Sequence, residues 1–148
     1  ELTASDRVAF HRYTYPEGAD RRVMVNLKEA NGDDRPVETF LKQVDEHTIQ
    51  GYRYSKGWSK DQRIFFTAVF SEPVVLSLID DQTPVEGTEL KGLNVKGNLT
   101  MNGPENQLLV KVGISPVRIS KQRFRTGISN MLSPKPIRNG TVSWQRSG

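Results

Sequence analysis

The feature that most constrains the fold of this chain is an alternation of apolar and polar residues with a period of two. Over residues 7–15, Val8, Phe10 and Thr14 fall on one face of an extended chain. Ala9, His11, Tyr13 and Tyr15 fall on the other. This period is typical of a half-buried β-strand, because successive side chains of a strand point to opposite faces. The pattern predicts strands rather than amphipathic helices.

Further runs of this kind follow, separated by residues typical of turns. The predicted strands cover residues 7–15, 22–27, 38–44, 48–54, 62–70, 74–79 and 107–114. Pro16-Glu17-Gly18 separates the first two, which predicts that they pair as a hairpin. Residues 80–106 contain dense turn sequences, such as Lys96-Gly97-Asn98, so only short strands are expected there. About eight strands and no helical pattern predict an all-β fold, an antiparallel β-sandwich.

One predicted strand has an apolar pattern on both faces. Residues 62–70 place Phe66, Ala68 and Phe70 on one face, and Phe65 and Thr67 on the other. Strands that are covered on both sides carry such aromatic and β-branched runs. We therefore expect residues 62–70 to form a central strand.

Length and composition restrict the class of protein. A chain of 148 residues has room for one domain of ordinary size. It contains no apolar run near 18 residues, so no membrane span is expected. The chain opens on the polar residues ELTAS without a charged and apolar leader, so a retained signal peptide is not expected either. The absence of an initiator Met predicts that Glu1 is a cut end. Because the chain has no cysteine, disulfides, thiolate metal sites and cysteine nucleophiles are excluded.

Charge is distributed unevenly along the chain. Residues 1–105 hold 13 Lys and Arg against 17 Asp and Glu, whereas residues 106–148 carry no acidic residue. The basic residues of this tail are Lys111, Arg118, Lys121, Arg123, Arg125, Lys135, Arg138 and Arg146. They form no repeated cluster and no nucleic-acid-binding motif, so a solvated extension is expected and a nucleic-acid partner is not. Within the tail, residues 120–131 could form a short helix, which Gly127 weakens.

Five motifs occur in a fixed order along residues 1–115. They are ELTASDRVAFHRYTYP at 1–16, IQGYR at 49–53, KGW and RIFF at 56–58 and 63–66, and VKVGIS at 110–115. In sequence, order and spacing they resemble the start of family 92 glycoside hydrolases, where an "ELTA-x-x-R-x-x-x-HRY-x-x-P" stretch opens the protein and a "VKVGIS" strand ends the sandwich. The resemblance implies a β-sandwich domain of the supersandwich type over residues 1–115.

The resemblance also implies a function. Enzymes of this family release mannose from α-linked mannosides with inversion and with calcium, and they are bacterial proteins of the periplasm, the cell surface or the medium. Their sandwich packs on a C-terminal (α/α)6 catalytic domain that holds both catalytic carboxylates and most calcium ligands. We therefore expect no catalytic residue, metal site or cofactor within these 148 residues, and we expect the chain alone to be inactive.

Residues 116–148 depart from the family pattern. An acidic, helix-rich segment is expected after Ser115, whereas the chain continues with the acid-free PVRISKQRFRTG. Residues 139–145, NGTVSWQ, resemble the family's linker helix only weakly. Two interpretations remain open: a divergent linker towards the (α/α)6 domain, and a gene end that never encoded that domain.

Three residues are candidate substrate contacts. Trp58 follows Gly57 in a loop between predicted strands, where an indole can offer an apolar platform to a pyranose ring or can cap the core. His11 and Arg12 are neighbours on a strand, so they must face opposite sides. Each could reach a sugar, or serve as a buried histidine and a salt-bridged arginine. His47 lies in a tight turn with Asp45 and Glu46, and three adjacent turn residues do not predict a metal site.

Two functions of different classes therefore remain. The first is the accessory domain of an α-mannosidase, which contributes to the rim of a cleft for α-mannoside glycans. The second is a free-standing carbohydrate-binding module, supported by the aromatic residues Trp58, Tyr52 and Tyr54. For the first, we expect an exposed apolar patch where the catalytic domain would dock, and a homodimer through that patch in the isolated chain.

Overall fold

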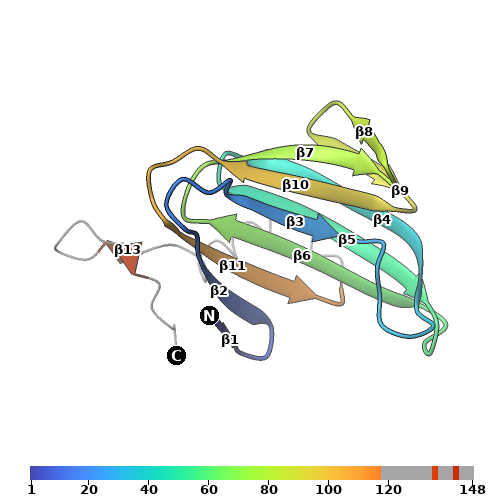
Figure 1. The fold of residues 1–148 in the computed structure, drawn as a ribbon. Helices are drawn as coiled ribbons and strands as arrows, with labels where there is room; N and C mark the ends of the chain where they lie inside the picture. Colours follow the sequence, from blue (N-terminus) through green and yellow to red (C-terminus); the bar gives the residue numbers. More distant parts are fainter. Residues whose placement is uncertain (118–134, 137–141, 144–148) are drawn as a thin grey trace. The chain divides into compact units, whose positions relative to one another are not determined.

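The computed structural model of the protein describes residues 1–117, 135–136 and 142–143, shown in Figure 1. The chain divides into two units, Glu1–Val117 and Arg118–Gly148. In the second unit, strand β12 (Lys135–Pro136) pairs with strand β13 (Val142–Ser143) in an antiparallel ladder. The helix predicted over residues 120–131 lies outside the described residues. No helix within the described part is long and apolar enough to cross a membrane.

The first unit consists of two antiparallel sheets, which confirms the predicted β-sandwich. The seven-stranded sheet has the order β1 (Leu2–Ala4), β2 (Val8–Thr14), β11 (Gln107–Ser115), β6 (Gln62–Phe70), β5 (Thr48–Lys56), β4 (Arg35–Asp45), β9 (Glu89–Gly92). The four-stranded sheet has the order β3 (Arg22–Asn26), β10 (Val95–Met101), β7 (Val74–Asp80), β8 (Thr83–Val85).

The core lies between the two sheets and follows from the alternation in the sequence. Each sheet turns one residue in two towards the other, and the hydrophobic residues buried between the sheets are mainly aliphatic. The seven-stranded sheet contributes Leu41, Ile49, Ala68, Phe70, Leu108 and Val110, and the four-stranded sheet contributes Val74, Leu76, Leu78, Val95, Leu99 and Met101. Leu41, Ile49, Val95, Leu99 and Leu108 are completely buried. Burial of these side chains is the main force that holds the sheets together.

The predicted central strand is confirmed. Strand β6 lies between β11 and β5 in the seven-stranded sheet. Ala68 and Phe70 point into the core, while Phe65 and Thr67 are buried on the outer face. The apolar pattern on both faces of this strand therefore corresponds to burial on both faces.

The predicted hairpin between residues 7–15 and 22–27 is wrong. Strand β2 pairs with β1 and β11, and β3 belongs to the other sheet, where it pairs with β10. The segment that contains Pro16-Glu17-Gly18 carries the chain from one sheet to the other, as Figure 1 shows. A turn sequence predicts that the chain reverses, but it does not say which sheet the next strand will join.

The prediction of only short strands in residues 80–106 is correct for β8 and β9 and wrong for β10. Strand β10 has seven residues and runs through Lys96-Gly97-Asn98, which the sequence pattern suggested was a turn. A Cβ at Gly97 would lie 2.5 Å from Leu41 Cδ2 and 2.7 Å from Leu76 Cδ1. The glycine is thus required inside the strand, where the side chains of both sheets approach closely.

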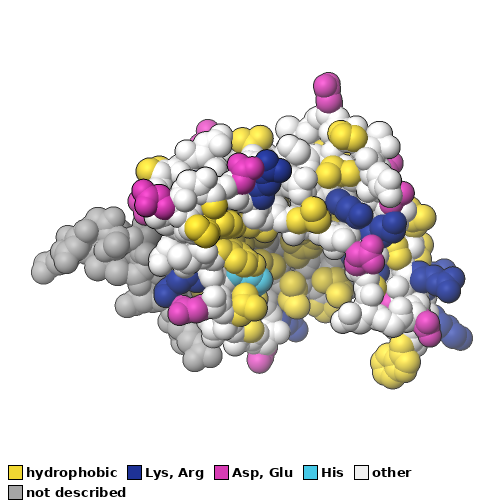
Figure 2. All heavy atoms as spheres, in the orientation of Figure 1, with side chains coloured by type: hydrophobic (Ala, Val, Ile, Leu, Met, Phe, Trp, Pro, Cys, Tyr) yellow, Lys and Arg dark blue, Asp and Glu magenta, His cyan; other side chains and the backbone are white. Residues whose placement is uncertain are grey.

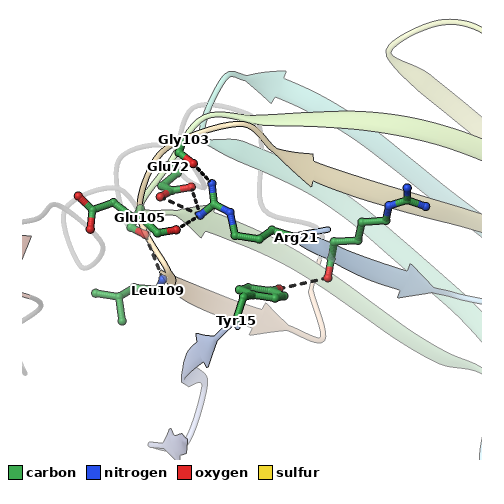
Figure 3. A network of polar contacts seen from close by, with 8 residues as sticks. Tyr15, Arg21, Glu72, Gly103, Glu105 and Leu109 are labelled. Carbon is green, nitrogen blue, oxygen red and sulfur yellow. Dashed lines mark hydrogen bonds and ion pairs between the residues drawn. The ribbon is translucent and has the colours of Figure 1, made fainter. Parts of the chain in front are cut away.

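A buried ion pair joins three connections at one end of the sandwich (Figure 3). Arg21 precedes β3, and its Nη1 donates to both carboxylate oxygens of Glu72, at 3.1 and 2.9 Å, in the β6–β7 connection. The guanidinium also donates to the carbonyl oxygens of Gly103 and Glu105, in the β10–β11 connection. Both charged side chains are 8% exposed. Each of these three connections crosses from one sheet to the other.

We predict that Glu72→Gln strongly destabilises the domain. The substitution leaves the Arg21 charge buried without a counter-charge, which typically costs about 3–5 kcal/mol. Urea denaturation followed by far-UV circular dichroism measures the free energy of unfolding. Glu1→Gln is the control, because it removes the exposed Arg12–Glu1 pair and should leave the unfolding midpoint nearly unchanged. Equal effects of the two substitutions would contradict a structural role for the buried pair.

Candidate functional site

Trp58 lies in the hairpin that joins β5 to β6 and is fully exposed. Among the residues that the structure describes, no other aromatic side chain is exposed. The alternative in which Trp58 caps the core is therefore wrong. An indole that contacts water on all sides contributes little to folding and remains available to a partner.

The turn that carries Trp58 is short and internally bonded. The backbone N–H of Gly57 donates to the carbonyl oxygen of Ser59 at 3.0 Å. The Ser59 hydroxyl donates to the carbonyl oxygen of Asp61 at 3.2 Å. Asp61 in turn accepts a hydrogen bond from Arg63 Nε at 3.1 Å, at the start of β6. Residues on both sides of Trp58 are thus engaged in local hydrogen bonds.

The hairpin also contacts the connection between β3 and β4. A Cβ at Gly57 would lie 2.7 Å from Asp34 Cα and 3.2 Å from the carbonyl oxygen of Asp33, so the two backbones touch. Asp34 forms an ion pair with Arg53, on the inner face of β5. The hydrogen bond from Arg53, aided by one from Ser55, lowers the pKa of Asp34 although partial burial opposes this shift. Asp34 is therefore a carboxylate at neutral pH.

His11 lies on the inner face of the seven-stranded sheet, opposite Val110. The ring is half-buried, and its Nδ1 lies 2.7 Å from the hydroxyl oxygen of Tyr13. Burial, together with the nearby N-terminal charge, lowers the pKa of His11. The imidazole is therefore mainly neutral at pH 7.

Arg12 points to the opposite side of the sheet, and its Nη1 lies 2.9 Å from a carboxylate oxygen of Glu1. The structure brings neither His11 nor Arg12 close to Trp58. His11 is level with Phe70 at the last residue of β6, whereas the hairpin lies before Gln62 at its first residue. This separation is about 26 Å along the strand. Sugar contact by His11 or Arg12 stays a prediction.

The neighbourhood of His47 is a turn with internal hydrogen bonds. Its backbone N–H donates to Asp45 Oδ1 at 2.9 Å, and its Nδ1 lies 3.1 Å from the carbonyl oxygen of Phe70. Among the described residues, no group of three or more His, Cys, Asp or Glu side chains could hold a metal ion. The donors present in this part of the chain do not fit a calcium site.

Tyr52 and Tyr54 lie on the outer face of the seven-stranded sheet, half-buried and stacked on each other with ring centroids 4.6 Å apart. Tyr52 also stacks on Phe40 at 5.2 Å, and the guanidinium of Arg63 lies 5.1 Å from the centroid of the Tyr54 ring. Their neighbours occupy much of the ring surface. These tyrosines therefore do not extend the open surface that Trp58 offers.

An apolar hollow lies below β3, over β6 and β11, in Figure 2. The inner faces of these strands carry Ile64, 39% exposed, and Ile114, 47% exposed, beside the partly buried Phe66 and Val112. The hollow exists because four strands face seven, so that part of the inner face of the larger sheet is uncovered. This cause cannot be predicted from the sequence, since the number of strands in each sheet depends on how the strands pair.

The ion pair of Asp34 and Arg53 was likewise not predicted from the sequence. They are 19 residues apart and belong to no motif of charged residues. Neither residue stands out in its local sequence, since Asp34 lies in a loop and Arg53 lies within a strand. Their pairing appears only when β4 and β5 lie side by side.

Comparisons with known proteins agree with this architecture. A protein-family model, the glycosyl hydrolase family 92 N-terminal domain, matches residues 1–115. The search of curated protein sequences gives no significant match.

Solved structures with a similar fold come from the same family. The family GH92 α-mannosidase BT3965 from Bacteroides thetaiotaomicron superimposes with a TM-score of 0.78 at 24% identity, over 90% of this chain and 19% of that one. The GH92 glycosyl hydrolase ccman5 gives 0.76 at 21% identity, over 97% and 18%. The inverting mannosidase BT2199 from B. thetaiotaomicron gives 0.70 at 19% identity, over 89% and 18%.

At these identities the structural similarity establishes the fold. This chain spans less than a fifth of the length of the solved proteins that it matches. The region that the family model matches coincides with the sandwich: it ends at residue 115, the last residue of β11. Because the family model covers more than three quarters of the sequence, the chain belongs to glycosyl hydrolase family 92, with its β-sandwich as the N-terminal domain of that family.

Proposed function

We propose that this chain is the N-terminal domain of an exo-acting α-mannosidase and that it shapes the rim of the substrate cleft. Membership of family 92 supports this proposal, as does the similarity to proteins described as mannosidases. The single observation that carries the rim function is the fully exposed Trp58 on a hairpin held by neighbouring loops.

Trp58 has the chemistry that a sugar contact requires. The flat indole can pack against the C–H groups of a pyranose, and its N–H can donate to a hydroxyl group. Lys56, Lys60 and Asp61 lie around it in the hairpin and supply polar groups for further hydroxyl contacts. Such a residue binds the ground state and the transition state alike, so it contributes to affinity rather than to the chemical step.

The chemical step belongs to the remaining part of the enzyme in this proposal. An inverting mechanism needs a general acid and a general base about 6.5–9.5 Å apart, with a water molecule between them. We assign both carboxylates and a calcium ion to an (α/α)6 catalytic domain. The description of BT2199 as an inverting mannosidase supports inversion.

The apolar hollow is the surface on which we propose that the rest of the enzyme packs. The matched proteins are more than five times as long as the aligned region, so each has ample further polypeptide to cover such a surface. In the isolated chain, a homodimer through the hollow would cover it instead. The bacterial source of two matched proteins supports a bacterial enzyme, and we propose export to the periplasm, the cell surface or the medium.

A free-standing carbohydrate-binding module remains the second candidate, because the exposed side chain of Trp58 could contact a sugar without a catalytic domain. The stacking of Tyr52 and Tyr54 favours the first candidate, since the two tyrosines do not join Trp58 in one open platform. The two proposals predict different aromatic contacts, and a titration with sugar can separate them.

We predict that methyl α-mannopyranoside shifts the NMR signal of the Trp58 indole N–H, with a dissociation constant on the order of millimolar. Trp58→Ala should abolish this binding and leave the melting temperature unchanged, because the side chain is fully exposed. In the intact enzyme the same substitution should raise KM more than it lowers kcat. Leu93→Ala, at another exposed apolar residue, is the control. Further shifts at Tyr52 and Tyr54, in addition to that of Trp58, would favour the binding module, and no aromatic shift would reject the sugar contact.

We also predict that the 148-residue chain releases no mannose from α-mannosides, with or without calcium. The reason is that the proposed acid and base lie in the other domain. Release of p-nitrophenol from p-nitrophenyl α-mannopyranoside, followed at 1 mM calcium and in EDTA, checks this expectation. Calcium-dependent release by the purified chain would show that the catalytic carboxylates lie here.

A further inference from the structure

The Trp58 hairpin rests on the β3–β4 connection at one defined point. Gly57, the residue before Trp58, has no side chain, and a Cβ there would lie 2.7 Å from Asp34 Cα and 3.1 Å from Asp34 N. These neighbours are backbone atoms, which cannot move aside as a flexible side chain can. The position of Asp34 therefore sets the position of the chain one residue before Trp58.

Arg53 holds both ends of that connection. Its Nε donates to the carbonyl oxygen of Leu27 at 2.9 Å, just after β3, and its Nη1 donates to Oδ2 of Asp34, just before β4. The Arg53 side chain is 16% exposed and that of Asp34 is 21% exposed. Because little water reaches this ion pair, it holds the loop more firmly than an exposed pair would.

We propose that Asp34 and Arg53 are positioning residues for Trp58, through the contact between Asp34 and Gly57. Arg53 fixes the β3–β4 connection to strand β5, the connection fixes Gly57, and Gly57 fixes the hairpin that presents the indole. A sugar platform held in place loses less entropy on binding than one on a free hairpin. This inference rests on the proposed function of Trp58 as a sugar contact.

Asp34→Asn tests the proposal, because it removes the charge from Asp34 and keeps the shape. Trp144→Phe is introduced first, so that Trp58 is the remaining tryptophan of the two in the chain. We expect the residual fluorescence anisotropy of Trp58 to fall by about half, as nanosecond motion of the hairpin increases. We also expect affinity for methyl α-mannopyranoside to fall about threefold to tenfold, because the platform is then less ordered.

Gly57→Ala is the second variant, and it tests the backbone contact without altering a charge. The added methyl group must push the hairpin away from Asp34, so the anisotropy of Trp58 should fall as it does in Asp34→Asn. Gly92→Ala is its matched control. Gly92 also lies at the end of a strand, but a Cβ there meets nothing closer than 3.5 Å, an ordinary van der Waals distance.

Glu72→Gln separates positioning from general loss of stability. It breaks a buried ion pair at the other end of the sandwich, so it should lower the melting temperature and leave the anisotropy of Trp58 in the folded protein unchanged. Unchanged anisotropy in Asp34→Asn, or an equal fall in Glu72→Gln, would overturn the positioning inference. If Trp58→Ala leaves sugar binding unchanged while Asp34→Asn still frees the indole, the sugar contact is what fails.

Discussion

The guanidinium of Arg21 is the constraint on which the sandwich most depends. It bonds to the carboxylate of Glu72 and to two backbone carbonyl oxygens, those of Gly103 and Glu105. These partners belong to the connections between β6 and β7 and between β10 and β11, and Arg21 itself lies between β2 and β3. One buried charge thus joins the three crossings between the sheets at this end, and these crossings connect the strands that enclose the core.

The opposite end of the sandwich is built differently. There the Arg53–Asp34 pair holds the connection between β3 and β4. The β5–β6 hairpin contacts this connection at Gly57. At each end an arginine bonds to a carboxylate and to the backbone: Arg21 to two carbonyl oxygens and Arg53 to one. At the first end the result is a closed, buried network. At the second it is a support from which an exposed tryptophan projects, the arrangement that suits a recognition surface better than a folding core.

Much of the secondary structure could be predicted from local alternation, because every second residue of a strand that is buried on one face is apolar. Strand β6 is the clearest case, with Phe66, Ala68 and Phe70 turned towards the core. Strand β10 was not predicted, and the reason also lies in its local sequence. Its Gly97 is typical of a turn, and only the approach of Leu41 and Leu76 from the two sheets explains a glycine inside a strand.

The sequence by itself determined the fold class, the family and the placement of Trp58 in a loop between two strands, because alternation and motifs can be read directly along the chain. That the Trp58 side chain is exposed and does not cap the core was decided by the tertiary structure. The tertiary structure alone decided which sheet β3 joins, the partners of Arg21 and Arg53, and the uncovered inner face at Ile64 and Ile114. These features arise where strands distant in sequence meet. Glu72, for example, lies 51 residues from Arg21. Hydrophobic alternation shows that a residue is buried, but it does not show which residue it contacts.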